Sequence, residues 1–125
     1  MSRDKFCEEV KAKFPIISAK ADKEYLRRWG DFKSDLYSYI WFESLANALN
    51  AEMNKGILPK EFQELFLFVS SSFLKGDEDI KKAIDVAFFE NLYWNVSSTA
   101  SELHWNHFPG VLQKLYLDFH GKKPF

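Results

Sequence analysis

The chain has 125 residues, of which 46% are hydrophobic, 18% aromatic and 28% charged, a balance that argues against a disordered protein. Its single cysteine excludes an internal disulfide and indicates a reducing compartment. The net charge is −1, but residues 34–108 are acidic, with five basic and eleven acidic side chains. The sequence contains no Lys/Arg cluster of the kind that binds nucleic acid, so we expect neither DNA nor RNA binding.

We expect a single cytoplasmic domain over residues 1–125, of a size that can bury one core without disulfides or metals. The first ten residues mix both charge signs and contain no apolar signal core. The longest uncharged apolar run, residues 65–74, is shorter than the roughly 20 residues of a membrane span. The expected partners therefore include no membrane and no nucleic acid, and the expected state is a monomer or a weak dimer.

Two amphipathic helices are predicted before residue 30, over residues 2–14 and 18–29. Ser2 is placed to cap the first helix, and Gly30 to end the second. The apolar positions expected to be buried are Phe6, Val10 and Phe14 in the first helix and Tyr25, Leu26 and Trp29 in the second. Cys7 lies beside the first apolar face, where we expect a small core residue and not a nucleophile.

Residues 34–54 predict a buried central helix, with Ser34 placed as its cap. Its apolar side chains cover almost the whole circumference, whereas a surface helix shows one stripe. Only a wedge with Glu43, Asn50 and Asn54 is expected to face water. A helix of this kind must be surrounded by other elements, so the sequence predicts an all-α bundle of six or seven helices around it.

An αα-hairpin is predicted over residues 59–95, because its two apolar helical segments are separated only by a short break at residues 75–77. Asp77 is placed to cap the second arm. Late in that arm, Glu90 falls between two apolar rows and Asn91 lies within one. Polar groups in such places need partners, so they either tie neighbouring helices together or line a site.

After a polar loop at residues 95–99, we expect a short helical turn over residues 101–108 and a last helix over residues 109–119. The last helix is expected to turn Leu112, Leu115, Tyr116 and Phe119 inward. No stretch alternates with period two for long enough to predict a strand.

The one metal-like pattern is His104 and His107, three residues apart on a helix, with Glu102 nearby. Zinc or iron would need one or two further ligands from elsewhere in the chain, so we expect no metal and no cofactor. The serine-rich segments match no nucleophile motif, and with five Gly in the chain there is no phosphate-cradling loop. The sequence therefore disfavours an enzyme.

Large aromatic side chains near acidic groups stand out in the sequence, although most aromatics in so small a domain must fill the core. Aromatic anchors beside charges are typical of protein interfaces. The residues expected to contact a partner are Asp35, Tyr39, Glu43, Asp85, Glu90 and Trp94.

Residues 35–49 and 76–94 resemble a pattern in small all-helical bacterial proteins of uncharacterised function. In that pattern an aromatic-rich helix precedes a hairpin whose second arm reads G-D-E and then V-x-F-x-E-N-L. The matching residues are Gly76, Asp77, Glu78, Val86, Phe88, Glu90, Asn91 and Leu92. Such proteins are similar in size and style to the cytoplasmic immunity proteins that accompany bacterial toxins, including those of contact-dependent growth inhibition.

This resemblance implies an immunity protein that neutralises a cognate toxin domain by stoichiometric blockade, and it implies no catalytic residues. The acidic surface would suit a basic nuclease toxin. A second hypothesis is a helical scaffold or adaptor of a bacterial assembly without catalytic activity. A third is a metal-dependent enzyme centred on His104 and His107.

Overall fold

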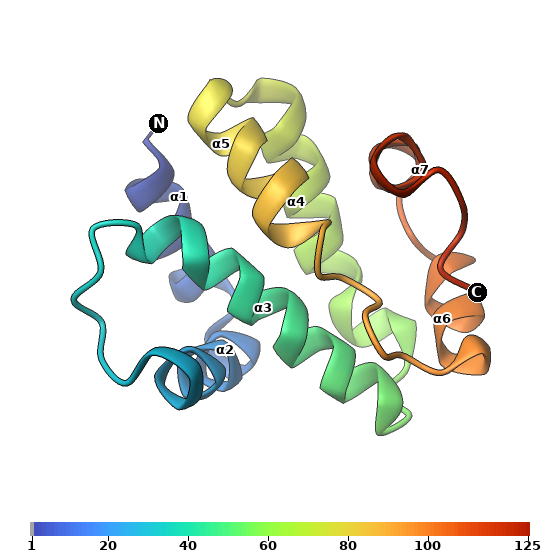
Figure 1. Cartoon of the computed structure of the whole chain (residues 1–125). Coiled ribbons are helices and arrows are strands. Elements are labelled where there is room, and N and C mark those ends of the chain that lie inside the picture. Colours follow the sequence, from blue (N-terminus) through green and yellow to red (C-terminus); the bar gives the residue numbers. More distant parts are fainter. Residues whose placement is uncertain (1) are drawn as a thin grey trace.

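The computed structural model describes residues 2–125, and every regular element within them is helical, which confirms the all-α prediction (Figure 1). The elements are α1 (Arg3–Lys13), α2 (Pro15–Trp29), α3 (Tyr37–Asn54), the 3₁₀ turn η1 (Pro59–Phe62), α4 (Gln63–Lys75), α5 (Glu78–Lys82), the π-helical segment η2 (Ala83–Phe88), α6 (Ser98–Trp105) and α7 (Gly110–His120). No helix in this part of the chain combines the length and the apolar character that a membrane span requires.

Helix α3 is the central element, as predicted from its apolar circumference. Packed on it are α1 and α2 on one side and η2 and α6 on the other (Figure 1). Its largest fully buried side chains are Trp41, Phe42, Leu45, Leu49 and Met53. The helix starts at Tyr37, and the prediction that Ser34 caps it is wrong, because the Ser34 hydroxyl accepts a hydrogen bond from the Leu36 N–H within the preceding turn.

Helices α1 and α2 meet at a sharp corner. The Ser2 hydroxyl caps α1 by accepting from the Lys5 N–H. Pro15 stands at the first position of α2, where its fixed φ suits a helix start and its missing N–H costs nothing, so α2 begins three residues earlier than predicted. Gly30 ends α2 with a φ of 82°, a left-handed conformation that glycine adopts without strain.

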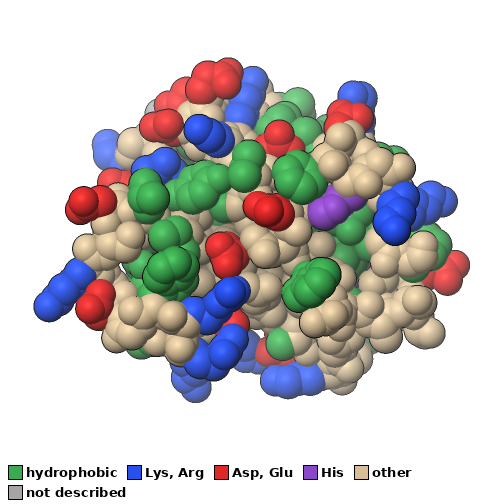
Figure 2. Space-filling model, in the orientation of Figure 1, with side chains coloured by type: hydrophobic (Ala, Val, Ile, Leu, Met, Phe, Trp, Pro, Cys, Tyr) green, Lys and Arg blue, Asp and Glu red, His purple; other side chains and the backbone are tan. Residues whose placement is uncertain are grey.

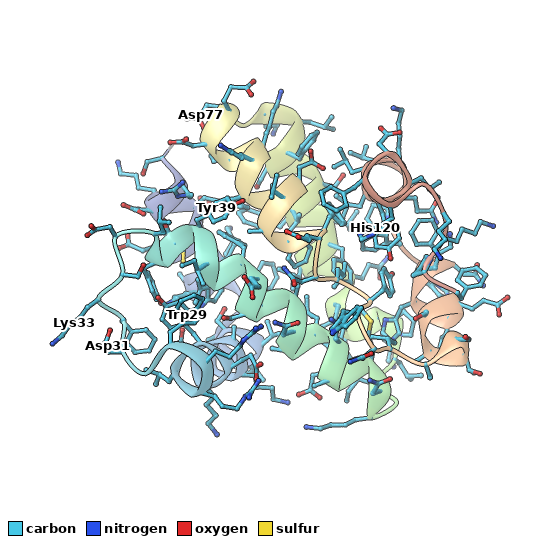
Figure 3. The ribbon with its side chains drawn as sticks, viewed as in Figure 1. Trp29, Asp31, Lys33, Tyr39, Asp77 and His120 are labelled. Atoms are coloured by element: carbon cyan, nitrogen blue, oxygen red, sulfur yellow. The ribbon has the colours of Figure 1, made fainter. Side chains whose placement is uncertain are left out.

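The predicted burial of two α2 side chains is wrong, since Leu26 is 39% and Trp29 50% exposed. The row that α2 buries consists of Ile17, Ala21 and Tyr25, which are spaced four residues apart. Trp29 follows in the last turn, where α2 leaves the core, so its ring lies beside that of Tyr25 at the end of the helix (Figure 3).

The hairpin is present, with α4 as its first arm and α5 with η2 as its second. Asp77 caps the second arm by accepting from the Ile80 N–H. A Cβ at Gly76 would lie 2.6 Å from the Ser72 carbonyl oxygen, so glycine allows the close turn. The second arm is less regular than expected: it continues from α5 as a π-helical segment and then as turns.

The C-terminal part of the chain closes the core with aromatic side chains. Helix α6 starts at Ser98, three residues before the predicted start, because the Ser97 hydroxyl accepts from the Ala100 N–H and caps it. The rings that join this part to the core are Tyr93, Trp105, Phe108 and Tyr116, with neighbouring centroids between 5.5 and 6.2 Å apart. Of the last helix, Phe119 is 42% exposed and was wrongly predicted to turn inward.

Candidate functional site

The candidate site is built on one side of α3, where the segment after η2 runs along the second half of the helix (Figure 1). Side chains three or four residues apart on a helix lie on the same side. Along this side of α3 lie Tyr39, Glu43, Asn47, Asn50 and Asn54. The first two were predicted to contact a partner, whereas the asparagines were not.

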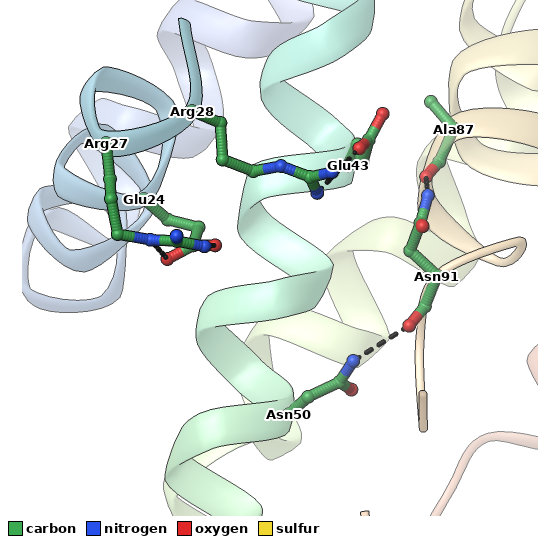
Figure 4. A network of polar contacts seen from close by, with 7 residues as sticks. All are labelled: Glu24, Arg27, Arg28, Glu43, Asn50, Ala87 and Asn91. Atoms are coloured by element: carbon green, nitrogen blue, oxygen red, sulfur yellow. Dashed lines mark hydrogen bonds and ion pairs between the residues drawn. The ribbon is translucent and has the colours of Figure 1, made fainter. Parts of the chain in front are cut away.

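Asn50 is 5% exposed and bonds to the backbone of the neighbouring segment with both ends of its amide. Its Nδ2–H donates to the Asn91 carbonyl oxygen at 2.8 Å (Figure 4), and its Oδ1 accepts from the Tyr93 N–H at 2.7 Å. A carboxamide is planar and offers a donor and an acceptor side by side, so it pairs with a backbone as an adjacent chain would. The expectation that Asn50 faces water is therefore wrong.

Asn54 repeats the same arrangement one helical turn later, at the exposed end of the segment. Its Nδ2–H donates to the Asn95 carbonyl oxygen and its Oδ1 accepts from the Ser97 N–H, both at 3.0 Å. We call Asn50 and Asn54 together the asparagine clamp. Two asparagines four residues apart in the apolar second half of the predicted central helix are the sequence signal that could have found it.

The clamp holds an unusual backbone. Tyr93 has a φ of 70° and Asn95 a φ of 57°, and side chains other than glycine rarely adopt such left-handed values. Between them, Trp94 is 68% exposed. Strained conformations persist only where the surrounding structure enforces them, and here the clamp bonds the backbone around both residues. The result is a large aromatic side chain presented to solvent from a backbone that is hydrogen-bonded to α3 on both sides of it.

An acidic group lies at the other end of the same side. Burial and then the negative charge of Glu90 raise the pKa of the Tyr39 hydroxyl, with a smaller contribution from Glu43, which places both carboxylates near that ring. The Arg3 guanidinium lies 5.6 Å from the centre of the Tyr39 ring, near the start of α3 (Figure 3). Acidic side chains occupy the middle of this face, above α3 and η2 (Figure 2).

The two carboxylates differ in how they are paired. Glu43 forms an ion pair with Arg28 of α2 at 3.0 Å (Figure 4), which neutralises much of its charge. Glu90 is exposed and forms no ion pair within residues 2–125. Glu90 is therefore the carboxylate on this side that is free to meet a cation.

The other two acids predicted to contact a partner lie elsewhere. Asp35 precedes α3 and lines a cavity of about 330 Å³ beside Asp4 and Glu8 of α1. Asp85 lies on η2, and burial together with the charge of Asp118 on α7 raises the pKa of its carboxyl group. Of the six residues predicted to contact a partner, Tyr39, Glu43 and Glu90 thus lie together beside the first half of α3. Trp94 stands apart from them, on the segment beside the second half of α3, and Asp35 and Asp85 lie elsewhere.

Asn91, for which two roles were left open, bonds locally. Its Nδ2–H donates to the Ala87 carbonyl oxygen one turn back, and only its backbone reaches α3 (Figure 4). This bond satisfies a carbonyl that the irregular end of the second arm leaves open. The tie between the two elements comes from Asn50, not from Asn91.

The two histidines considered as metal ligands lie in different environments. His104 is 2% exposed, and its Nε2–H donates to the Ile57 carbonyl oxygen at 2.8 Å. Burial lowers its pKa, so the ring is neutral at neutral pH. His107 is exposed. Among residues 2–125, no three His, Cys, Asp or Glu side chains are placed to hold a metal ion.

Cys7 is a core residue, as predicted. It is 2% exposed, and burial raises the pKa of its thiol to about 12. Because the thiolate is the nucleophile, a thiol with this pKa is inert at neutral pH.

A family model described as a domain of unknown function, DUF7674, matches residues 7–121. The chain belongs to the DUF7674 family. The match extends from α1 to the end of α7, so the DUF7674 domain includes α3, the hairpin and the asparagine clamp. It agrees with the resemblance to an uncharacterised helical family and does not bear on toxin immunity. Comparison with curated proteins and with solved structures gave no match.

Proposed function

We propose that this DUF7674 protein is a non-catalytic, immunity-type protein that binds a bacterial toxin domain in the cytoplasm and neutralises it by stoichiometric blockade. The observation that carries the proposal is the exposed Trp94, held on a strained segment by the asparagine clamp. Rigid aromatic side chains lose little entropy on binding and are the commonest hot spots of protein interfaces.

The acidic side chains on the same side of α3, at the end away from Trp94, indicate a basic partner. Glu90, two residues after the end of η2, is exposed and forms no ion pair within residues 2–125, and Tyr39 lies near it. A cationic surface, such as the nucleic-acid-binding face of a nuclease toxin, would be attracted by this acidic face and its encounter rate raised. Covering that surface would block the toxin without any reaction by the immunity protein.

Co-expression with the toxin encoded next to the gene tests this proposal. We expect restored growth and a one-to-one complex of the two purified proteins. Absence of rescue together with absence of a complex would overturn the proposal. If growth returns but the purified proteins form no complex, the protein does not act by stoichiometric blockade, and the proposal is also overturned. A stable complex with a structural protein in place of a toxin would favour the scaffold hypothesis.

Two matched pairs of variants locate the surface. Glu90→Lys should slow association with the toxin and reduce the fall of its rate with salt, whereas Glu102→Lys, the same charge change at an exposed position of α6, should leave the rate unchanged. Trp94→Ala should speed dissociation by about tenfold or more, whereas Trp29→Ala at the end of α2 should not. Equal effects within either pair would place the interface elsewhere.

A further inference from the structure

A groove of about 510 Å³ lies between two parts of the chain. The corner between α1 and α2 forms one wall, and the end of α3 together with η1 and the start of α4 forms the other, which we call the α3–η1 wall. Its inner surface is mainly apolar, with Ile17, Phe62 and Leu65 buried in it. Both lips carry apolar side chains that point into solvent, Ile16 at 80% and Leu58 at 52% exposure. An exposed apolar groove with apolar lips marks an interaction site.

The two walls of the groove carry opposite charges. Lys13 and Lys20 belong to the α1–α2 wall, and Glu52 and Glu61 to the α3–η1 wall. Lys20 and the buried Glu52 form an ion pair across the groove. Lys13 and Glu61 form no ion pair within residues 2–125. The Lys13 ammonium lies 5.4 Å from the centre of the Phe68 ring, a contact that leaves its charge without a counter-ion. Each wall therefore keeps one charge that is not neutralised, the cation of Lys13 and the anion of Glu61.

We propose that this groove is the interface of a homodimer with two-fold symmetry. A two-fold axis that lies outside the protomer and runs parallel to the length of the groove places the α1–α2 wall of one protomer over the α3–η1 wall of the other. Ile16 of each protomer then contacts Leu58 of the partner subunit, and Lys13 of each protomer pairs with Glu61 of the partner subunit. Both contacts occur twice, which is the property of an isologous interface.

The charge arrangement selects a second copy over other occupants. A ligand or peptide with one charged end would satisfy one wall and be repelled by the other. A second copy brings both signs in the required order, and it covers the apolar lips at the same time. Because the groove is small, we expect a weak dimer that forms with rising protein concentration. This inference uses residues away from Trp94 and does not depend on the proposed function.

Sedimentation velocity of the full chain over a series of concentrations tests the dimer. We expect a reversible monomer–dimer equilibrium that Ile16→Glu weakens by about tenfold or more, because the variant places a carboxylate against the apolar lip and the acidic wall. Leu74→Glu on α4, at a position that is 64% exposed and outside the groove, should leave the equilibrium unchanged. A monomer at every concentration, open-ended oligomers, or an Ile16→Glu dimer as tight as the wild type would overturn the proposal.

A charge swap tests the pairing itself. Lys13→Glu and Glu61→Lys should each weaken dimerisation, and the double variant should restore it, because each pair forms again with its signs exchanged. Lys13 and Glu61 are exposed, so the variants should fold, and an unchanged thermal transition verifies this. A double variant that is as weak as the single variants would show that these two residues do not face each other.

Discussion

The backbone N–H of Tyr93 donates to the side-chain oxygen of Asn50 at 2.7 Å, inside the protein and across 43 residues of sequence. The bond joins the central helix to the segment in which Tyr93 has a left-handed backbone. One side chain thus supports both the packing of α3 and the position of Trp94. Substitutions of Asn50 should therefore lower the stability of the protein and also disturb the position of Trp94 on the proposed binding surface.

Asn50→Ala should lower the free energy of unfolding by about 2–4 kcal/mol, because it leaves the buried N–H of Tyr93 and the carbonyl of Asn91 without their partner. Urea denaturation followed by circular dichroism measures this loss. Asn54→Ala removes the same two kinds of bond at an exposed position, where water replaces them, so its loss should be about 1 kcal/mol or less. Equal losses would show that burial does not distinguish the two halves of the clamp.

Substitutions of Asn95 separate the backbone strain of the segment from its hydrogen bonds. The clamp bonds the backbone oxygen of Asn95 and not the Asn95 side chain, so a change of side chain leaves that bond in place. At a φ of 57°, Asn95→Gly should change the free energy of unfolding by less than about 0.5 kcal/mol or raise it, while Asn95→Val should lower it by about 1–2 kcal/mol. Denaturation of the two variants in parallel measures the difference. If valine is tolerated as well as glycine, the left-handed backbone at this position is not required.

His104 should make the protein less stable in mild acid. Burial holds its folded-state pKa below the ordinary value of 6.5, so the unfolded chain binds the proton more readily. The contribution of the neutral His104 ring to stability is therefore complete above the ordinary pKa of 6.5. It is lost as the pH falls through the lower pKa of the folded state.

Denaturation midpoints measured at about pH 7 and about pH 5 should differ less for His104→Gln than for the wild-type protein, because glutamine does not titrate. His107→Gln is the control, because His107 is exposed and lies just after the end of α6. The denaturation midpoints of this variant at the two pH values should differ as much as those of the wild-type protein. A wild-type pH dependence in His104→Gln would assign the acid sensitivity to other groups.

Cys7 should react with thiol reagents only when the protein unfolds. Its thiol is 2% exposed and burial raises its pKa to about 12, so the native state offers neither access nor thiolate. The raised pKa contributes stability below the ordinary value of 9.0, and this contribution is lost as the pH rises through the folded-state value. Labelling in mild alkali should therefore be slow without denaturant and fast with it, and fast labelling of the native protein would contradict the burial.

Local patterns explain how much of the fold could be predicted. Helical spacing of apolar residues depends on neighbours within a turn or two, and so do the caps at Ser2 and Asp77 and the glycine end of α2. The apolar circumference of α3 identified the central helix for the same reason. The errors at two helix starts also have local causes. Pro15 is the first residue of α2 and does not only end α1, and Ser97 is the cap of α6 and not part of a loop.

Residues that face distant parts of the chain could not be placed in this way. Trp29 continues an apolar row but lies past the end of the contact between α2 and α3. Asp35 lies beside α1 and Asp85 near α7, and nothing in the residues next to either of them in the sequence indicates this. Whether an acidic side chain is paired, buried or free is set by elements that arrive from elsewhere in the sequence.

The amino-acid sequence by itself determined that this protein is all-α, that α3 is its buried axis and that a hairpin follows it, because these properties arise from spacing within single segments. Only the tertiary structure decided that Asn50 is a buried tie, that Trp94 stands on a strained segment and that a groove with oppositely charged walls forms beside α2. Those features require partners 41 and 43 residues apart to meet, and a hydrogen bond or an ion pair between distant segments leaves no period in the sequence.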